Sequence, residues 1–398
     1  MVISPLLDRD SQEISRVPDH NTSNPSTALV LSGGGARAAY QVGVLKGLAE
    51  ILPRKKGAYF PIISGTSAGS INAAALAADA DNFHQGVAKL IDVWSNFEPH
   101  HVFQTKPWGL MSRVARWGWA SIGIGDPKNG PQSLLDNAPL RDLLSDRIDF
   151  DQIQSQVAKG HLSALSVTAC SYTSGRSTSF FAGTDTLEPW SRVRRDGVAD
   201  LINVEHLMAS SAIPIVFPPV LLNDEYFGDG SMRQNAPISP ALHLGASKVL
   251  IVGVRAEGDT TEQESISHPT VGQIAGYIMD TLFLNSMHSD IERLERINST
   301  LEHVPDSVPS EAVKFNTIEH TVISPSVDIA SIAERHYGNL PRALRNLLKL
   351  IGMEKGTSRR FISYLMFEKS FCRELIEYGR KDALEMENEL LELLSGSV

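Results

Sequence analysis

A serine between two glycines is the first residue of this sequence with a clear chemical use. Residues 61–72 read PIISGTSAGSIN, which places Ser67 between Gly65 and Gly69 directly after an apolar run. A serine on a sharp turn between a strand and a helix presents its hydroxyl as a nucleophile, and small flanking residues relieve the crowding of that turn. Given ordinary glycine and serine usage, this five-residue pattern also arises by chance, so the surrounding sequence has to decide.

A run of three glycines could supply groups that stabilise the reaction. A serine nucleophile needs a base within hydrogen-bond reach and donors for the oxyanion that forms on the attacked carbonyl. Gly33, Gly34 and Gly35 follow an apolar run and precede a helical pattern, where free backbone N–H groups are expected. Nucleotide binding is the weaker alternative, because the glycine spacing and the lysine of phosphate-binding loops are missing.

The strongest candidate for the base is an aspartate. The chain has 12 histidines, and none stands in a recognisable catalytic setting. His206 and His243 are expected in helices, with structural or surface roles. Asp229, in YFGDGSMRQNAP, comes directly after a short strand on a turn with Gly230, which would hold its carboxylate rigidly. The alternative for an isolated Asp-Gly pair is a plain hairpin turn.

Both glycine-containing turns lie between a predicted strand and a predicted helix. Ala28–Leu31 is an apolar run that ends at the three glycines, and the following ARAAYQVGVLKGLAEIL has apolar residues at helical spacing. Phe60–Ser64 predicts a second strand and Ser70–Ala80 a second helix. Two such units in succession predict a parallel sheet with helical crossovers. Further strands are expected at Ser163–Ala169, Tyr226–Phe227 and Lys248–Val254.

Composition limits the class of protein. With 398 residues, of which 42% are apolar and 21% charged, the chain has an ordinary globular composition and room for a large α/β domain with an appendage. A net charge of −10 argues against a general nucleic-acid binder. We expect no secretory signal and no membrane-spanning helix, and Cys170 and Cys372 fit a reducing compartment. A cytoplasmic protein, either soluble or peripheral at the inner face of the membrane, is therefore expected.

Several segments, taken in order, resemble the patatin-like phospholipase family. In chain order they are a glycine loop, a serine turn, a segment between this turn and the aspartate, and a proline-rich stretch followed by an Asp-Gly turn. They read LSGGGARAAY, SGTSAGS, SLLDNAPLRDLL, and ASSAIPIVFPPV followed by FGDGSMRQNAP. Each motif is weak alone, but their order matches the family over roughly residues 27–255.

The resemblance implies a Ser–Asp dyad without histidine and without a metal or cofactor. Ser67 would be the nucleophile and Asp229 its base, provided that burial raises the pKa of the carboxylate. The oxyanion hole would be the run Gly33, Gly34 and Gly35. Arg37 would hold this loop or its local charge, and Gly65, Gly69 and Gly230 would have supporting roles. Ser32 stands where some members have aspartate and Ala38 where glycine is frequent, which leaves substrate preference open.

The implied fold is a three-layer α/β/α sandwich with a mostly parallel central sheet and a C-terminal helical extension. We expect a flexible leader at 1–26, the catalytic domain at 27–325 and the helical extension at 326–398. The implied activity is phospholipase A-type hydrolysis of acyl esters in phospholipids or other lipids. A thioesterase or acyltransferase of the same fold is one alternative, and a non-catalytic regulatory binding module is another.

Two segments are candidates for contact with a membrane surface. In 340–351, leucines recur at helical spacing with Arg342, Arg345 and Lys349 on the other side, which describes a basic amphipathic helix. The favoured alternative is that this apolar stripe packs on the protein's own core. The second candidate is the Trp108–Trp119 region, because tryptophan favours the headgroup zone of a bilayer.

Overall fold

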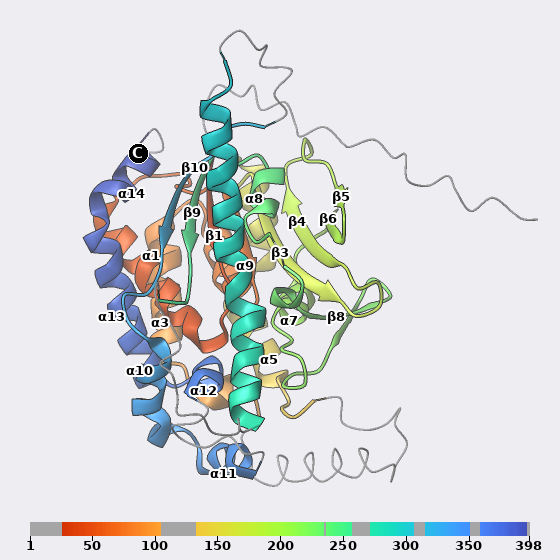
Figure 1. The fold of residues 1–398 in the computed structure, drawn as a ribbon, viewed down its shortest axis with the longest axis vertical. Helices are drawn as coiled ribbons and strands as arrows, with labels where there is room; N and C mark the ends of the chain where they lie inside the picture. The colour runs from red at the N-terminus through yellow and green to blue at the C-terminus, as the bar shows by residue number, and fades with distance from the viewer. Residues whose placement is uncertain are drawn as a thin grey trace, which may run out of the picture.

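A mostly parallel sheet runs through the middle of the molecule (Figure 1). The structure is a computed structural model that describes residues 26–104, 133–234, 236–256, 271–305, 315–350 and 359–395. In this part of the chain the strand order is β10-β9-β1-β2-β3-β4-β6-β5. The strands are β1 (Thr27–Leu31), β2 (Ile62–Thr66), β3 (Ala164–Ser171), β4 (Ser177–Gly183), β5 (Trp190–Arg192), β6 (Arg195–Ala199), β7 (Val220–Leu222), β8 (Glu225–Asp229), β9 (Lys248–Val252) and β10 (Glu319–Ile323).

The strands that carry the motifs run in one direction. β10, β9, β1, β2 and β3 are mutually parallel along the sheet. β4 and β8 both pair antiparallel with β3, and β7 forms a hairpin with β8. The carboxyl ends of β1, β2 and β3 therefore lie at one edge of the sheet, and β8 arrives there from the opposite direction.

Helices cover both faces of the sheet, because its central strands are apolar on both sides. Ala28 and Val30 of β1 belong to one buried cluster, whereas Leu29 and Leu31 belong to the other. The helices with described bounds are α1 (Ala39–Ile51), α2 (Ala68–Ala78), α3 (Phe83–Ser95), α5 (Ala138–Arg147), α6 (Phe150–Ala158), α7 (Val204–Ser210), α8 (Ser239–His243), α9 (Val271–Glu302), α10 (Ile329–His336), α11 (Arg342–Leu350), α12 (Arg359–Leu365), α13 (Lys369–Glu385) and α14 (Glu387–Leu394). Residues of α8 and α9 join the first cluster, and α1, α2, α3 and α13 the second, which confirms the predicted three-layer sandwich.

The second strand is shifted relative to its prediction. The sequence favoured Phe60–Ser64, but β2 spans Ile62–Thr66 and ends directly before Ser67. Pro61 explains the later start, because proline has no N–H to donate and is found mainly at the beginning of strands. The strands β4–β7 and β10 were not predicted, since none of them contains more than three consecutive apolar residues.

The C-terminal helix α13 packs closely on α1. A Cβ at Gly43 of α1 would lie 2.2 Å from the Ile376 carbonyl oxygen of α13, and one at Gly379 would lie 2.1 Å from that of Tyr40. In α11 and just before it, Leu340, Leu344, Leu347 and Leu348 are buried in the core. These leucines therefore pack on the protein's own core, as the favoured alternative to membrane contact predicts.

Some predictions fall outside the described residues. These are most of the leader, residues 1–25, and the whole Trp108–Trp119 region. Among the residues that the structure describes, none of the helices combines the length and the apolar character needed to cross a bilayer.

Candidate active site

Ser67 occupies a strained turn between β2 and α2. Its backbone has φ 53° and ψ −131°, a conformation that costs energy for a residue with a side chain. Two close approaches explain the flanking glycines. A Cβ at Gly65 would lie 2.5 Å from the Gly69 carbonyl oxygen, and one at Gly69 would lie 2.4 Å from that of Leu31. The turn can therefore form only with glycine at both positions.

The structure brings Asp229 to this serine. The Ser67 hydroxyl donates a hydrogen bond to Asp229 Oδ2 at 2.6 Å, although the two residues are 162 positions apart. Asp229 ends β8 and is paired with Ala169 near the end of β3, which lies next to β2. A Cβ at Gly230 would lie 2.1 Å from the Thr168 carbonyl oxygen, so the chain after Asp229 passes directly against β3.

Burial changes the acidity of the aspartate. Asp229 has no exposed surface, and its Oδ1 accepts a hydrogen bond from the Ser231 N–H at 2.9 Å. Desolvation raises the pKa of Asp229 to about 6, and the hydrogen bonds from Ser67 and Ser231 oppose that rise. A carboxylate with such a pKa accepts a proton more readily than an exposed aspartate and is still ionised at neutral pH.

The pH dependence of activity should report this pKa. We expect kcat/KM for a soluble acyl ester to fall on the acid side with a midpoint near pH 6, because Asp229 must be deprotonated to act as a base. An exposed aspartate would give a midpoint near about 4. A pH–rate profile measured with an ester whose detection does not depend on pH distinguishes these two midpoints. A midpoint near about 4 would contradict a desolvated base.

Ser210 supports the turn and was not identified from the sequence. Its Oγ accepts the Ser67 N–H at 2.9 Å and donates to the Thr168 carbonyl oxygen at 2.6 Å. The serine at the turn is thereby tied to β3. Because the Ser67 N–H already donates to Ser210, the donors for an oxyanion have to be other N–H groups. The segment ASSAIP contains Ser210, but nothing in its local pattern distinguishes this serine from Ser211.

The glycine run lies beside the same site. Within the described residues, no backbone acceptor is recorded for the N–H groups of Gly33, Gly34 and Gly35. Gly35 has φ 53° and borders the cavity that Ser67 also borders. A Cβ at Gly34 would lie 2.6 Å from a methyl group of Val254, so the Val254 side chain packs directly against the loop.

Arg37 joins this loop to the C-terminal helices. Its side chain is buried, and its Nε donates to Ser363 Oγ at 2.8 Å. The guanidinium lies 4.1 Å from the centre of the Tyr364 ring. The Tyr364 carbonyl oxygen would in turn be 2.3 Å from a Cβ on Gly35. Arg37 therefore fixes α12 against the glycine run, a contact that the sequence could not reveal.

The two histidines considered above have other surroundings. His206, on α7, is buried beside Asp200, with 3.4 Å between Nε2 and Oδ2. His243, on α8, stacks on the Trp190 ring with centroids 4.8 Å apart. Burial lowers the pKa of each. None of the recorded hydrogen bonds of the Ser67 and Asp229 side chains in the described residues involves a histidine.

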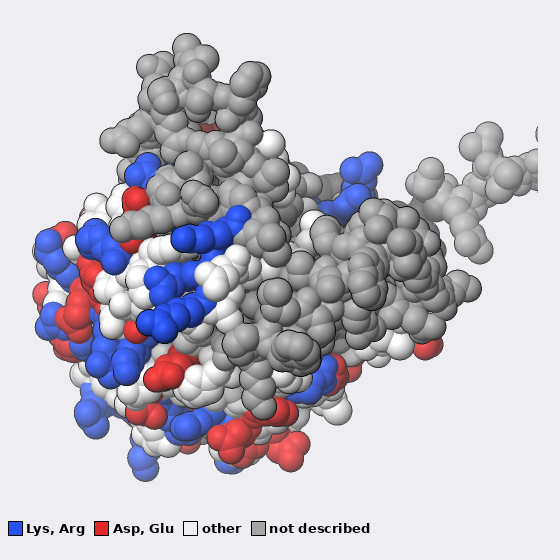
Figure 2. Space-filling model, turned by 90° about the horizontal axis from the view of Figure 1, so that it is seen from below, with Lys and Arg blue, Asp and Glu red and all other residues white. Residues whose placement is uncertain are grey.

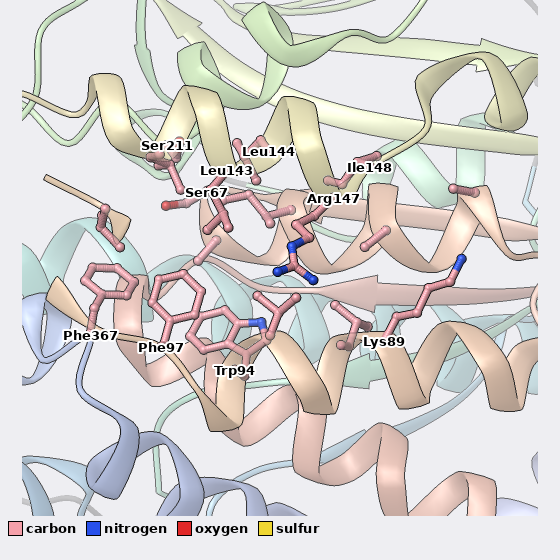
Figure 3. Close-up of a pocket in the computed structure, with 18 of the residues that line it drawn as sticks. Ser67, Lys89, Trp94, Phe97, Leu143, Leu144, Arg147, Ile148, Ser211 and Phe367 are labelled. Carbon is pink, nitrogen blue, oxygen red and sulfur yellow. The ribbon is translucent and has the colours of Figure 1, made fainter. Parts of the chain in front are cut away.

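A mostly apolar cavity of about 320 Å³ opens next to Ser67, between α2, α3 and α5. Figure 3 shows Ser67, Phe97 and Phe367 toward one end, Lys89 toward the other, and the guanidinium of Arg147 between them. Such a cavity, with a few polar groups beside apolar walls, suits a ligand with a long apolar part. The part played by Phe367 in it was not predicted, because this residue follows α12 near the end of the chain.

Comparison with known proteins assigns the chain to a family. The model of the patatin-like phospholipase family matches residues 29–242. A cGAMP-activated phospholipase of Vibrio cholerae is 24% identical over 345 residues, covering 77% of this chain and 89% of that protein. A protein of the same name from Pseudomonas aeruginosa is 26% identical over 286 residues, covering 67% and 74%.

A solved structure of human GIVD cytosolic phospholipase A2 in complex with methyl gamma-linolenyl fluorophosphonate aligns with 98% of this chain and 60% of its own. Its sequence identity of 13% and TM-score of 0.43 are too low to add support. The match of the family model over more than half of the chain is sufficient: the chain belongs to the patatin-like phospholipase family.

Proposed function

We propose that the chain is a phospholipase A-type acyl hydrolase that works through an acyl-enzyme on Ser67. The observation that carries this proposal is the 2.6 Å hydrogen bond from the Ser67 hydroxyl to a fully buried carboxylate, at the end of an apolar cavity. Family membership supports lipid hydrolysis in general. The hydrogen bond supports nucleophilic attack by Ser67 with Asp229 as its base.

The proposed reaction has two halves. As Ser67 Oγ bonds to the ester carbonyl carbon, its proton passes to Asp229, and the carbonyl oxygen becomes an oxyanion facing the N–H groups of Gly34 and Gly35. Collapse of this intermediate breaks the ester bond, and the leaving alcohol takes the proton from Asp229. Water then attacks the acyl-enzyme, gives its proton to Asp229, and releases the fatty acid as Ser67 regains its hydrogen.

The alternatives are weaker on physical grounds. A binding module would gain nothing from a strained serine and a buried carboxylate, both of which lower stability. A thioesterase or acyltransferase would share the first half of the reaction and differ in the leaving group or in the acceptor. The apolar cavity and the phospholipase relatives favour a lipid ester as the substrate.

We propose that the enzyme meets its substrate at an anionic membrane surface through charge. Figure 2 shows Lys and Arg side chains gathered on the face seen from below, where α11 lies in Figure 1. Arg342 and Lys349 are exposed on α11, and Arg345 is partly exposed, while the leucines point inward. Cations near an anionic surface each contribute about 1 kcal/mol to binding, so this face could hold the protein at a bilayer despite its net charge of −10.

Control by a cyclic dinucleotide is a further part of the proposal. The relatives are named as cGAMP-activated, and their similarity reaches beyond the catalytic segment. The alignment with the Vibrio cholerae protein covers 77% of this chain, whereas the family model ends at residue 242. An assay of this enzyme should therefore be run both with and without cGAMP.

Vesicle hydrolysis tests the proposed function. We expect fatty acid and lysophospholipid to be released from vesicles containing phosphatidylglycerol, in the presence of cGAMP if not in its absence. Reversing two charges, with Arg342→Glu and Lys349→Glu together, should weaken vesicle binding by about tenfold or more. Raising the salt should weaken binding of the unaltered protein.

Controls separate these outcomes. Lys159→Glu makes the same kind of change at an exposed residue shortly before β3, at the amino end of the sheet, and should leave vesicle binding unchanged. If the folded protein releases no fatty acid with or without cGAMP, the proposed hydrolase is wrong. If it hydrolyses the vesicles but the double reversal binds them normally, only the docking face is wrong.

A further inference from the structure

The cavity beside Ser67 is a channel that follows one helix. Its residues from α2 are Ala68, Ile71, Ala75 and Ala78, which recur every three or four positions and so form one stripe of the helix. Because α2 begins directly after Ser67, this stripe starts at the predicted nucleophile and leads away from it along the helix axis. Three of the four side chains are a single methyl group, which leaves the space in front of the stripe open.

The remaining walls are made of larger apolar side chains. Leu90, Val93 and Trp94 of α3 and Leu143 and Leu144 of α5 also line the cavity, and Figure 3 shows Trp94 on one side of it and Leu143 and Leu144 on the other. The combination of a smooth wall of small residues and a wall of bulky ones leaves a narrow apolar space. Such a space fits a single extended alkyl chain better than a ring system or a pair of chains.

The length of the stripe sets a limit on that chain. Ala78 is eleven residues beyond Ser67, and a rise of about 1.5 Å per residue gives a channel of about 16 Å. Carbon–carbon bonds of about 1.5 Å at tetrahedral angles advance an extended alkyl chain by about 1.25 Å per carbon. The channel therefore holds about 13 carbons.

The far end of the channel is charged. Lys89 Nζ lies 2.7 Å from Oδ1 of Asp79, which directly follows Ala78 in the chain, and Figure 3 shows Lys89 at the end away from Ser67. Within the channel, each additional buried methylene strengthens binding by about fourfold. A longer chain would gain nothing there and would bring its methyl end among charged groups that prefer water.

We propose that the α2 channel binds the acyl chain of the substrate and selects chains of medium length, with the charged end as its limit. This inference rests on the proposed function. It names the substrate class as lipids with an acyl chain of about 12 to 14 carbons. Ala75 and Lys89 are the residues that determine the specificity, since the first lies within the channel and the second at its end.

A chain-length series tests this inference. Fatty-acid release is measured on phosphatidylglycerols with octanoyl, decanoyl, dodecanoyl, tetradecanoyl and octadecanoyl chains, in mixed micelles that keep the surface constant. The rate should rise up to the dodecanoyl or tetradecanoyl lipid and fall by about fivefold or more for the octadecanoyl lipid. In Ala75→Phe, a ring fills the channel eight residues from Ser67, so the ratio of tetradecanoyl to octanoyl hydrolysis should fall by at least about tenfold.

Two further variants make the test decisive. Ala88→Phe carries the same substitution at an exposed position of α3, outside the cavity lining, and should keep the profile of the unaltered enzyme. Lys89→Met replaces the cation at the far end, where the lysine side chain is 58% exposed, by an apolar side chain and should raise octadecanoyl relative to tetradecanoyl hydrolysis. This variant decides the question if Ala75→Phe does not fold.

The outcomes distinguish the channel from the function. A profile that is flat through the octadecanoyl lipid, with no change of ratio in Lys89→Met, would overturn the channel while leaving the hydrolase intact. Absence of hydrolysis for every chain length in the folded protein would overturn both.

Discussion

Replacing Ser67 with alanine is expected to reduce fatty-acid release by at least about a thousandfold, which corresponds to about 4 kcal/mol of barrier. The substitution removes the only atom that can form the proposed acyl-enzyme. It also removes the hydrogen bond that opposes the rise in the pKa of Asp229. Rates on phospholipid micelles measure the loss. Ser299→Ala, at an exposed position of α9, is the matched control and should keep full activity.

Folding has to be verified for this comparison. Ser67 has a positive φ whether its side chain is serine or alanine, so the strain of the turn stays the same. The variant should therefore unfold cooperatively, close to the temperature of the unaltered protein. A correctly folded Ser67→Ala enzyme with substantial hydrolysis would exclude Ser67 as the nucleophile.

Asp229→Asn should have two opposite effects: a loss of activity of about a thousandfold and a gain in stability at neutral pH. The activity falls because the amide cannot take the proton of Ser67. The stability rises because a neutral side chain replaces a carboxylate that is fully buried and ionised at pH 7.

The stability effect has a defined sign and pH range. The pKa of Asp229 is about 6 in the folded protein, whereas the ordinary pKa of an aspartate, as in the unfolded chain, is 3.8. Between these values the folded state binds more protons, so stability rises as the pH falls from 6 toward 4 and is lowest above 6. At neutral pH the ionised carboxylate costs about 3 kcal/mol.

Denaturation at two pH values checks this prediction. Asp229→Asn should be the more stable protein near neutral pH, with a difference that decreases as the buffer approaches about pH 4. Asp382→Asn is a useful comparison, because Asp382 is a buried carboxylate that accepts hydrogen bonds from Tyr40 and Ser326 outside the site. It should lose stability, since an amide cannot replace all of these acceptors. Retained activity in Asp229→Asn would show that the base is elsewhere.

These two predictions describe one property of the site. The turn at Ser67 is strained, and the carboxylate beside it is desolvated, so both reacting groups are held in states that lower stability. The surrounding contacts offset this cost. Ser210 ties the turn to β3, and Arg37 ties the glycine run to α12.

Local patterns were sufficient to predict the elements that hold the serine. The apolar run before Gly33 and the one before Ser67 each specify a strand that is buried on both faces, and the glycines after them specify turns. Periodicity did not predict β4–β6, because the sequences STSFFAG, WSR and RDGVA show neither a long apolar run nor a regular alternation of polar and apolar residues. The predicted strand begins two residues before β2, because Pro61 has no N–H to donate and the strand starts only after it.

The position of the aspartate depends on pairing between distant segments. Asp229 reaches Ser67 because β8 pairs with the end of β3, a contact that local sequence cannot predict. Its candidate role came from the resemblance to a family, together with the turn at Gly230. Ser210, Phe367 and the helix α12 reach the site by the same kind of long-range packing, and none of them has a distinctive local pattern.

Covalent labelling tests the central claim most directly, because it requires an activated serine and no knowledge of the natural lipid. The protein is treated with an alkyl fluorophosphonate, and the labelled peptide is identified by mass spectrometry. We predict a single modified residue, Ser67, with no labelling in Ser67→Ala and much slower labelling in Asp229→Asn. Labelling of another serine, or equal labelling of the Asp229→Asn protein, would contradict a dyad of Ser67 and Asp229.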